Sequence, residues 1–270
     1  SQRVGGKVSK KFNNIKHDYP MYSLDNSYSK QDLDSFNTRI LKKIPNSDLT
    51  YLCELKFDGV SINLTYENGY LVTAVTRGDG VYGDDVTENV KTIKTVPLKL
   101  KGNYPQKFQI RGEIFIELND FNQMNIERAE NGLEPYMNPR NTASGSLKLQ
   151  DSSEVSKRPL KCFLYQVVSE NDDSKTQYDN LLSASSWGFN VSDSYKLCSS
   201  IDEVFDFINR WDKKRNNLDF EIDGIVIKVN QIDYQKTLGF TSKYPRWSIA
   251  YKFKTLQAST SLLSINYQVG

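Results

Sequence analysis

The sequence predicts an α+β domain with mainly antiparallel sheets flanked by helices. Segments with strand-like alternation recur along the whole chain, among helical segments. Two of these segments, 60–66 and 70–76, flank Glu67-Asn68-Gly69, and an Asn-Gly turn between alternating apolar runs is a strong hairpin signal. Because hairpins join antiparallel strands, a doubly wound parallel sheet is not favoured.

The remaining elements follow from periodicity along the chain. Residues 1–28 are predicted to be irregular, with Gly5-Gly6 and Pro20 as breakers and a short ordered piece at 21–26. Ser29 is typical of a helix cap, and apolar residues recur at helical spacing from there until Pro45. Further strands are expected at 51–55, 108–116, 162–168, 222–229 and 246–253. Further helices are expected around 86–93, at 118–131, after the loop 135–145, at 176–187, at 200–216 and near 231–238, with a surface loop at 169–174.

Composition indicates a globular protein without a strong bulk charge. The chain has 270 residues, of which 38% are hydrophobic and 12% aromatic, enough to build one large domain or two small ones. Thirty-five basic residues against 33 acidic ones leave a formal net charge of +2. This balance argues neither for nor against a nucleic-acid partner, so any basic surface must be local.

The few cysteines and the single histidine argue against several kinds of metal and catalytic site. Cys53, Cys162 and Cys198 lie far apart without a CxxC pair, which indicates neither a zinc site nor a disulfide framework. His17 is the only histidine, so a His-based triad and a His-rich metal site are excluded, and a structural role is expected. No stretch approaches the roughly 20 apolar residues that span a bilayer, and no signal segment opens the chain. We therefore expect a soluble, cytoplasmic protein without a protein-built metal site.

The stretch Cys53-Glu54-Leu55-Lys56-Phe57-Asp58-Gly59 is the first candidate for chemistry. In a strand, side chains alternate between faces, so Glu54, Lys56 and Asp58 would share one face while the apolar residues between them point into the core. A lysine between two carboxylates on a stiff support is a candidate nucleophile. Solvated charges at a strand end are the alternative.

Segment 222–229 is apolar on both faces apart from Asp223 and Lys228, as in a strand buried on both sides. A lysine in such a strand must find an anion, because an unpaired buried ammonium costs several kcal/mol or loses its proton. Snorkelling of Lys228 from the strand end is the alternative.

Segment 246–253 alternates cleanly. Its aromatic and aliphatic residues share one face, and Lys252 lies on the other face beside Ser248 and Ala250. Lys252 would then line a cleft, unless this face of the sheet is simply wet and basic.

Two further segments place charges where a ligand could use them. Glu113 shares a strand face with Gln109 and Arg111, and its carboxylate could hold a ribose hydroxyl or form an ordinary salt bridge. The loop 138–148 mixes turn residues, basic residues and a helix start, so it either faces phosphates or only connects elements.

Residues 78–83 fit the dinucleotide fingerprint G-x-G-x-x-G, but the match is weak. Asp79 would place negative charge against a pyrophosphate, and the preceding strand belongs to a hairpin rather than to a parallel unit. The favoured interpretation is a tight turn that presents Arg77 into the cleft.

Together these blocks resemble the adenylation (nucleotidyltransferase) domain of NAD-dependent DNA ligases. The resemblance covers nearly the whole chain, with the blocks in the family's order. The blocks are SLDN at 23–26, ELKFDG at 54–59, TRGDGVYGDDVTENV at 76–90, RGEIF at 111–115, NPRNTASGSL at 138–147, EIDGIVIKV at 221–229 and RWSIAYKF at 246–253. The resemblance implies the ligase adenylation fold, with antiparallel sheets around a nucleotide cleft.

The resemblance implies that Lys56 attacks the α-phosphate of NAD, releases nicotinamide mononucleotide (NMN) and keeps AMP on its side-chain nitrogen, for later transfer to the 5′-phosphate of a DNA nick. It implies that Asp58 assists the chemistry or metal placement, and that Mg²⁺ acts as a hydrated ion. Lys228, Lys252 and Arg77 would lower the pKa of Lys56 and neutralise phosphate charge.

By the same resemblance, Glu54 would bind the adenine amine, Glu113 the ribose, and Tyr165 would stack on the base. Ser23 and Leu24 would touch the nucleotide. Three basic residues would grip nicked duplex DNA: Arg140, Lys148 and Arg215. Lys148 stands where the family usually has arginine, which keeps the charge but forfeits a bidentate grip.

One position separates this pattern from relatives that use ATP or GTP. Those ligases and capping enzymes typically carry KxDGxR, and here Ser61 occupies the arginine position, which supports NAD as the adenylate donor. An ATP-dependent ligase or capping-type enzyme, and a catalytically idle nucleic-acid-binding module, are the alternatives. Labelling by ATP in preference to NAD would favour the first, and tight nick binding without adenylation the second.

The domain expectation is one adenylation domain over 1–270, excised from a longer ligase. The family's N-terminal NMN-binding domain and its OB-fold, zinc, helix-hairpin-helix and BRCT modules are then absent. We expect such a fragment to be a monomer that binds AMP, adenylates itself poorly and does not seal nicks alone, with roles in DNA repair and replication belonging to the full enzyme.

Overall fold

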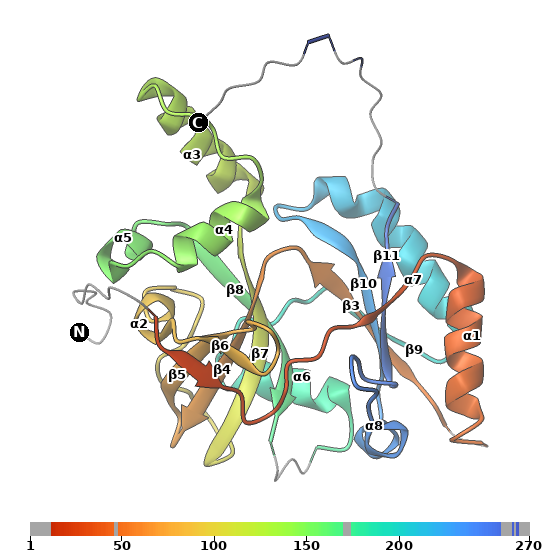
Figure 1. The fold of residues 1–270 in the computed structure, drawn as a ribbon. Coiled ribbons are helices and arrows are strands. Elements are labelled where there is room, and N and C mark those ends of the chain that lie inside the picture. Colours follow the sequence, from red (N-terminus) through yellow and green to blue (C-terminus); the bar gives the residue numbers. More distant parts are fainter. Residues whose placement is uncertain (1–11, 46–47, 170–173, 255–260, 262, 265–270) are drawn as a thin grey trace.

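The computed structural model describes residues 12–45, 48–169, 174–254, 261 and 263–264. Two larger sheets lie next to each other, and each is flanked by helices (Figure 1). All strand pairs in them are antiparallel except one, so the predicted α+β fold with mainly antiparallel sheets is confirmed. The beginning of the irregular segment expected at 1–28 and most of the loop expected at 169–174 lie outside the described residues.

A five-stranded sheet has the buried strand β10 at its centre. Its strands, in spatial order, are β2 (Asp25–Ser27), β11 (Ser248–Lys252), β10 (Ile222–Val229), β3 (Tyr51–Phe57) and β9 (Tyr195–Cys198). Strand β2 runs parallel to β11, and the other neighbours are antiparallel. The register places Gly224 of β10 between Lys56 of β3 and Lys252 of β11.

A four-stranded sheet contains the predicted hairpin. Its order is β5 (Tyr70–Thr76), β4 (Val60–Glu67), β7 (Lys107–Ile116) and β8 (Leu160–Val168). Asn68 and Gly69 both have positive φ, 50° and 77°, as the tight hairpin turn between β4 and β5 requires. The Asn-Gly prediction is therefore confirmed.

The segment expected to be irregular at 1–28 contains two short strands. Strand β1 (Asn14–Lys16) pairs with β6 (Tyr82–Asp84) in the glycine-rich loop, and β2 joins the five-stranded sheet. Each has three residues, too short for a visible alternation in the sequence. The expectation of an irregular segment was wrong for β1, whereas β2 overlaps the short ordered piece expected at 21–26. Partners distant in the chain impose the extended form on both strands.

Helices cover the outer sides of both sheets. Two helices, α1 (Lys30–Leu41) and α7 (Ile201–Lys214), pack on the five-stranded sheet with the core residues Leu33, Val204 and Ile225 (Figure 1). Ser29 caps α1 through a capping box with Asp32. The other helices are α2 (Thr87–Val90), α3 (Leu118–Glu130), α4 (Pro139–Leu147), α5 (Ser152–Ser156), α6 (Gln177–Ser186) and α8 (Ile232–Leu238), with a 3-10 turn, η1, at Arg215–Asn217.

The sequence predicts a loop at 135–145 that is followed by a short helix, and the structure of block 138–147 differs from this prediction. Asn138 accepts a hydrogen bond from the Asn141 amide, Pro139 occupies the first turn, and the whole segment Pro139–Leu147 is helical. The turn-forming residues of this block are therefore the start of helix α4 itself.

An aromatic cluster joins the two sheets at one end. Phe57 of β3 stacks on Phe163 of β8 with 4.7 Å between ring centroids, and Phe163 stacks on Phe115 of β7 at 4.9 Å. Phe220 packs edge-on against all three rings. Each sheet otherwise has its own buried cluster of apolar side chains. The space between the sheets beyond the aromatic cluster is where the candidate site lies.

Candidate active site

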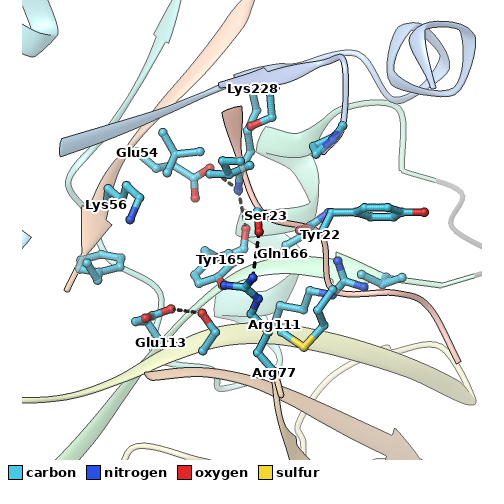
Figure 2. Close-up of a pocket in the computed structure, with 18 of the residues that line it drawn as sticks. Tyr22, Ser23, Glu54, Lys56, Arg77, Arg111, Glu113, Tyr165, Gln166 and Lys228 are labelled. Atoms are coloured by element: carbon cyan, nitrogen blue, oxygen red, sulfur yellow. Dashed lines mark hydrogen bonds and ion pairs between the residues drawn. The ribbon is translucent and has the colours of Figure 1, made fainter. Parts of the chain in front are cut away.

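A cavity of about 520 Å³ opens between the two sheets. Strands β3, β10 and β11 line it from one side, and β4, β7 and β8 line it from the other. Residues 19–24 and Phe240 close a third side. Glu54, Lys56, Glu113, Tyr165 and Lys228 lie around this hollow (Figure 2). The size suits a nucleotide-sized ligand.

Lys56 reaches the cavity from β3 and shares a carboxylate with a second lysine. Its Nζ lies 3.0 Å from Asp223 Oδ1, and Lys252 forms an ion pair with the same carboxylate. A register shift between Ile222 and Gly224 re-aims the Asp223 side chain toward both lysines. Burial lowers the pKa of Lys56 and the Lys252 charge lowers it further, whereas Asp223 opposes the shift. The amine is therefore partly activated and held by one counter-ion.

Glu54 and Lys228 form a buried ion pair across β3 and β10. Lys228 Nζ lies 2.6 Å from Glu54 Oε2, and the two side chains are 6% and 9% exposed. Lys228 also donates to the Tyr165 carbonyl at 3.1 Å and lies 5.3 Å from the centroid of the Tyr165 ring. Burial raises the pKa of Glu54, and the Lys228 charge opposes that rise. The sequence-based expectation that Lys228 finds an anion is confirmed.

Glu113 projects into the cavity from β7. The Ser61 hydroxyl donates to Glu113 Oε2 at 2.8 Å. Burial raises the pKa of Glu113 to about 7, while the Ser61 hydrogen bond lowers it. Gly59 makes this arrangement possible, because a Cβ there would lie 2.3 Å from the Ile114 carbonyl oxygen. Glu113 is therefore a carboxyl group that can change its protonation state near neutral pH.

Asp58, predicted to assist the chemistry, lies one residue beyond the end of β3 and is not among the residues that line the cavity. Arg140 of α4 donates to Asp58 Oδ1 at 2.7 Å, and the Asp58 amide donates to the Glu221 carbonyl at 3.0 Å. The Asp58–Arg140 pair thus ties α4 to the strand that holds Lys56.

The glycine-rich loop is a tight turn, as the sequence favoured. Gly78 and Gly80 have φ values of 56° and 94°, and Asp79 Oδ1 accepts from the amides of Val81 and Tyr82. The loop leads into β6 instead of a long helix, and β5 before it is antiparallel to β4. A dinucleotide-binding βαβ unit is therefore excluded, and Arg77 faces the cavity, donating to Ser23 Oγ at 2.8 Å.

Residues 17–24 form a segment, here named the strap, and its residues 19–24 close the third side of the cavity. The amides of His17 and Met21 donate to the carbonyls of Val81 and Gly80, each at 2.8 Å. His17 has the structural role expected from the sequence, since its Nε2 lies 3.1 Å from the Thr76 carbonyl. Tyr22 stacks on Phe240 with 4.9 Å between ring centroids. Ser23 and Leu24 of the strap line the cavity.

The cavity wall has an excess of positive charge. Two acidic residues in the wall are Glu54 and Glu113. The cationic residues in the wall are Lys56, Arg77, Arg111, Arg140, Lys228 and Lys252. Such a wall favours an anionic ligand and suits phosphate groups.

Most of the predicted site residues meet in this cavity. Those that line it are Ser23, Leu24, Glu54, Lys56, Arg77, Glu113, Arg140, Tyr165, Lys228 and Lys252. Two predicted DNA-contacting residues lie outside the cavity wall. Lys148 pairs with Asp84 at 2.8 Å, and Arg215 packs over the Phe253 ring and donates to the Lys254 carbonyl.

Sequence reasoning gave no role to Asp223 and Arg111. Asp223 is one of two charged residues in an otherwise apolar strand, but this pattern alone predicts a partner only for the buried lysine, Lys228. Arg111 shares the alternating face of Glu113, which was also visible. The sequence does not reveal the partners of these two residues. The direction of the Asp223 side chain depends on a register shift between strands. The strap that Arg111 contacts lies more than 90 positions away in the chain.

Two kinds of feature are absent from the described residues. No group of three or more His, Cys, Asp or Glu side chains is placed to hold a metal ion within the described ranges. No helix in that same part of the chain is long and apolar enough to cross a membrane.

Comparisons of the sequence point to one family. A family profile described as "NAD-dependent DNA ligase adenylation domain" matches residues 9–256. A protein named DNA ligase from Flavobacterium johnsoniae is 60% identical over 270 residues, and one from Cytophaga hutchinsonii is 49% identical over 271 residues. Both matches cover 100% of this chain and 40% of the relative, so the chain spans about two fifths of the length of these curated relatives.

Two solved structures of DNA ligases match part of this chain. The ATP-dependent DNA ligase from bacteriophage T7 in complex with ATP matches 80% of this chain and 65% of its own, with a TM-score of 0.40 and 15% identity. A putative ATP-dependent DNA ligase from Aquifex aeolicus matches 79% of this chain and 46% of its own, with a TM-score of 0.40 and 11% identity.

Proposed function

Because the chain belongs to the family of NAD-dependent DNA ligase adenylation domains, we propose that it is the catalytic core of a DNA ligase that takes its adenylyl group from NAD. Lys56 Nζ attacks the α-phosphorus of NAD. A P–N bond forms while the bond from that phosphorus to the bridging oxygen breaks, so NMN leaves and AMP stays on Lys56. The AMP then passes to the 5′-phosphate of a DNA nick.

The observation that supports this most directly is the position of Lys56 at the wall of a cation-rich cavity. Its pKa is lowered by burial and by Lys252, which raises the fraction of neutral amine available for attack. The ammonium must lose a proton first, and the Asp223 carboxylate, 3.0 Å from Nζ, accepts it in this proposal. Lys252 and Arg77 then stabilise charge on the phosphates.

Adenosine recognition is proposed for the side of the cavity away from Asp58. Glu54 accepts a hydrogen bond from the adenine amine, while Lys228 holds Glu54 in place at 2.6 Å. The Tyr165 ring stacks on the base, and Glu113 accepts from a ribose hydroxyl. Ser23 and Leu24 contact the nucleotide from the strap.

The donor set was tested against Mg²⁺, which prefers oxygen ligands and usually keeps several waters. Within the described residues no three-carboxylate cluster exists, so a protein cage does not fit. A hydrated ion held mainly by the nucleotide phosphates fits, and Glu113 in the cavity wall and Asp58, which pairs with Arg140 of that wall, are the carboxylates that would lie beside it. When bound, it would neutralise phosphate charge.

Contact with nicked DNA is proposed for Arg140, Lys148 and Arg215. Arg140 and Lys148 support this best, because their side chains are 55% and 48% exposed at the two ends of α4. Arg215 is 19% exposed and already contacts Asp212. We further propose that the chain is one domain of a longer ligase, because its relatives extend well beyond the matched region. We also propose that this ligase acts as a monomer.

Intact-mass measurement after incubation with NAD and Mg²⁺ tests the proposal. We expect one adenylyl group to be added slowly, because the family resemblance assigns the NMN half of NAD to another domain. Lys56→Ala should abolish the added mass, and the exposed Lys236→Ala, whose partner is Asp233, should not. An adduct that persists in Lys56→Ala would refute the role of Lys56, and preferential labelling by ATP would refute the use of NAD.

A further inference from the structure

Strand β7 presents three alternate side chains toward the cavity side of its sheet. Gln109 Nε2 donates to Asp18 Oδ2 at 3.1 Å, and Arg111 Nη2 donates to the carbonyls of Tyr19 and Pro20, each at 3.0 Å. Glu113, the next residue on this face, points to the cavity itself (Figure 2). One strand face therefore contacts both the beginning of the strap and the proposed ribose site.

The Arg111 contact is made to main-chain atoms of the strap. The carbonyls of Tyr19 and Pro20 are fixed by the backbone, so the contact specifies where the strap runs and not which side chains it has. A register shift in the β7–β8 pairing falls between Arg111 and Gly112, which re-aims side chains at this point. Gly112 allows β8 to come close, because a Cβ there would lie 2.4 Å from the Phe163 carbonyl oxygen.

Arg111 has no carboxylate partner in any ion pair of the described residues. Its Nε is buried without a hydrogen-bond partner in that part of the chain. Holding a guanidinium in a partly buried place without an anion is costly, so the two carbonyls are the contacts that compensate it. The strap residues that follow, Tyr22 to Leu24, all line the cavity.

We infer that Arg111 is a positioning residue, which holds the strap over the nucleotide through the carbonyls of Tyr19 and Pro20. This inference rests on the proposed function. Arg111 acts on the ligand through Ser23 and Leu24, and it takes no part in the transfer chemistry. Loss of its donors should free the strap and weaken AMP binding.

The test combines hydrogen–deuterium exchange with calorimetric AMP binding on the same chain. Arg111→Met removes the donors at similar length, and hydrogen bonds from charged groups correspond to about 10- to 100-fold changes in local opening. We expect about that acceleration for the amides of His17 and Met21, with unchanged exchange in β4, and AMP binding weakened by about tenfold or more.

Two further variants control the test. Lys107→Met removes a cation from the same strand, where it pairs with Glu67 at 2.9 Å and is 62% exposed, and it should change neither readout. Arg111→Lys keeps the charge and one donor group, and it should restore part of the protection of the strap. Should Arg111→Met fail to fold, Arg111→Lys serves as the test variant, with a smaller expected change of the same sign.

The outcomes separate this inference from its rivals. Weaker AMP binding with unchanged strap exchange would overturn it, since Arg111 would then contact the ligand directly. Faster strap exchange with unchanged AMP affinity would overturn it too, because the strap would not contribute to binding. If the unsubstituted chain bound no AMP, the proposed function would fail, while the exchange comparison would still decide whether Arg111 holds the strap.

Discussion

Asp223 illustrates how one side chain sets the state of the proposed nucleophile. Its carboxylate contacts both Lys56 and Lys252, so two ammonium groups share a single negative charge. The carboxylate keeps Lys56 oriented toward the cavity and also favours its protonated form. Asp223 therefore helps to orient Lys56 but reduces the nucleophilicity of its amine.

Asp223→Asn should make the Lys56 amine more reactive. The amide keeps the shape of the side chain but removes the charge that raises the pKa of Lys56, so the pKa falls further below its ordinary value. The rate of reductive methylation of Lys56 at pH 8, followed by peptide mass, should rise. Asp58→Asn removes the carboxylate that pairs with Arg140 and should leave this rate unchanged. An unchanged or slower rate in Asp223→Asn would contradict the pairing.

Glu113 should make stability depend on pH in the neutral range. Its pKa is about 7 in the folded chain against 4.5 without burial, so the folded state binds the proton more tightly. The free energy of unfolding therefore falls as pH rises from about 4.5 to about 7, by about 3 kcal/mol for this group. Urea unfolding at several pH values should show this loss in the unsubstituted chain and not in Glu113→Gln.

Ser61→Ala is the matched variant for that experiment. The Ser61 hydroxyl donates to Glu113 and lowers its pKa, so its removal should extend the loss of stability to higher pH. Parallel pH profiles for the unsubstituted chain and Glu113→Gln would show that Glu113 does not titrate in this range.

At the level of elements, the close packing of β10 against its neighbours depends on one glycine. A Cβ on Gly224 would lie 1.9 Å from the Tyr251 carbonyl oxygen, so β11 could not keep its present distance. This closeness is what brings Lys252 and Lys56 to either side of β10.

Gly224→Ala should lower the free energy of unfolding by about 1–3 kcal/mol, as overpacking of a core does. Gly145→Ala is its matched control, because Gly145 lies in α4 with no atom near its would-be Cβ. That control should raise stability by up to about 1 kcal/mol through helix propensity. Urea unfolding checks both signs, and a neutral Gly224→Ala would show that β11 can shift at little cost.

The elements differed in how well the sequence predicted them. The hairpin at Asn68-Gly69, the capped helix α1 and the buried strand β10 were predicted because each has a local signal of turn chemistry, capping or alternation. Strand β9 was missed because it has four residues and takes its extended form from pairing with β3. Short strands of this kind depend on tertiary contacts that no local pattern contains.

The sequence predicted those site residues that lie on strands with a clear alternating pattern. Alternation correctly placed Lys56 and Lys252 on faces that line the cavity, and the cost of burial correctly required a partner for Lys228. The strap contacts of Arg111 were not predictable, since they join residues about 90 positions apart without a pattern on either side.

At the level of the whole molecule, two sheets with separate cores share one cavity. The aromatic cluster around Phe57 and Phe163 joins the sheets at one end, and both sheets contribute charged side chains to the cavity wall. A ligand that bridges the wall therefore adds contacts between the two halves of the molecule.

AMP should stabilise the whole chain against unfolding. A ligand that binds only the folded state adds about 2.7 kcal/mol at a concentration 100 times its Kd. Thermal unfolding should therefore shift upward with AMP. GMP should give a smaller shift, because guanine presents a carbonyl where adenine would offer its amine to Glu54. Equal shifts for the two nucleotides would contradict the proposed role of Glu54.

The surplus of cations in the cavity wall also acts before any contact is made. The positive potential of the wall attracts an approaching nucleotide with charged phosphates and speeds its arrival, and dissolved ions screen this attraction. The association rate should therefore decline as ionic strength increases. The dissociation rate is governed by contacts within the cavity and should depend much less on ionic strength. The salt concentration of the buffer should therefore change how fast the nucleotide binds more than how long it stays bound.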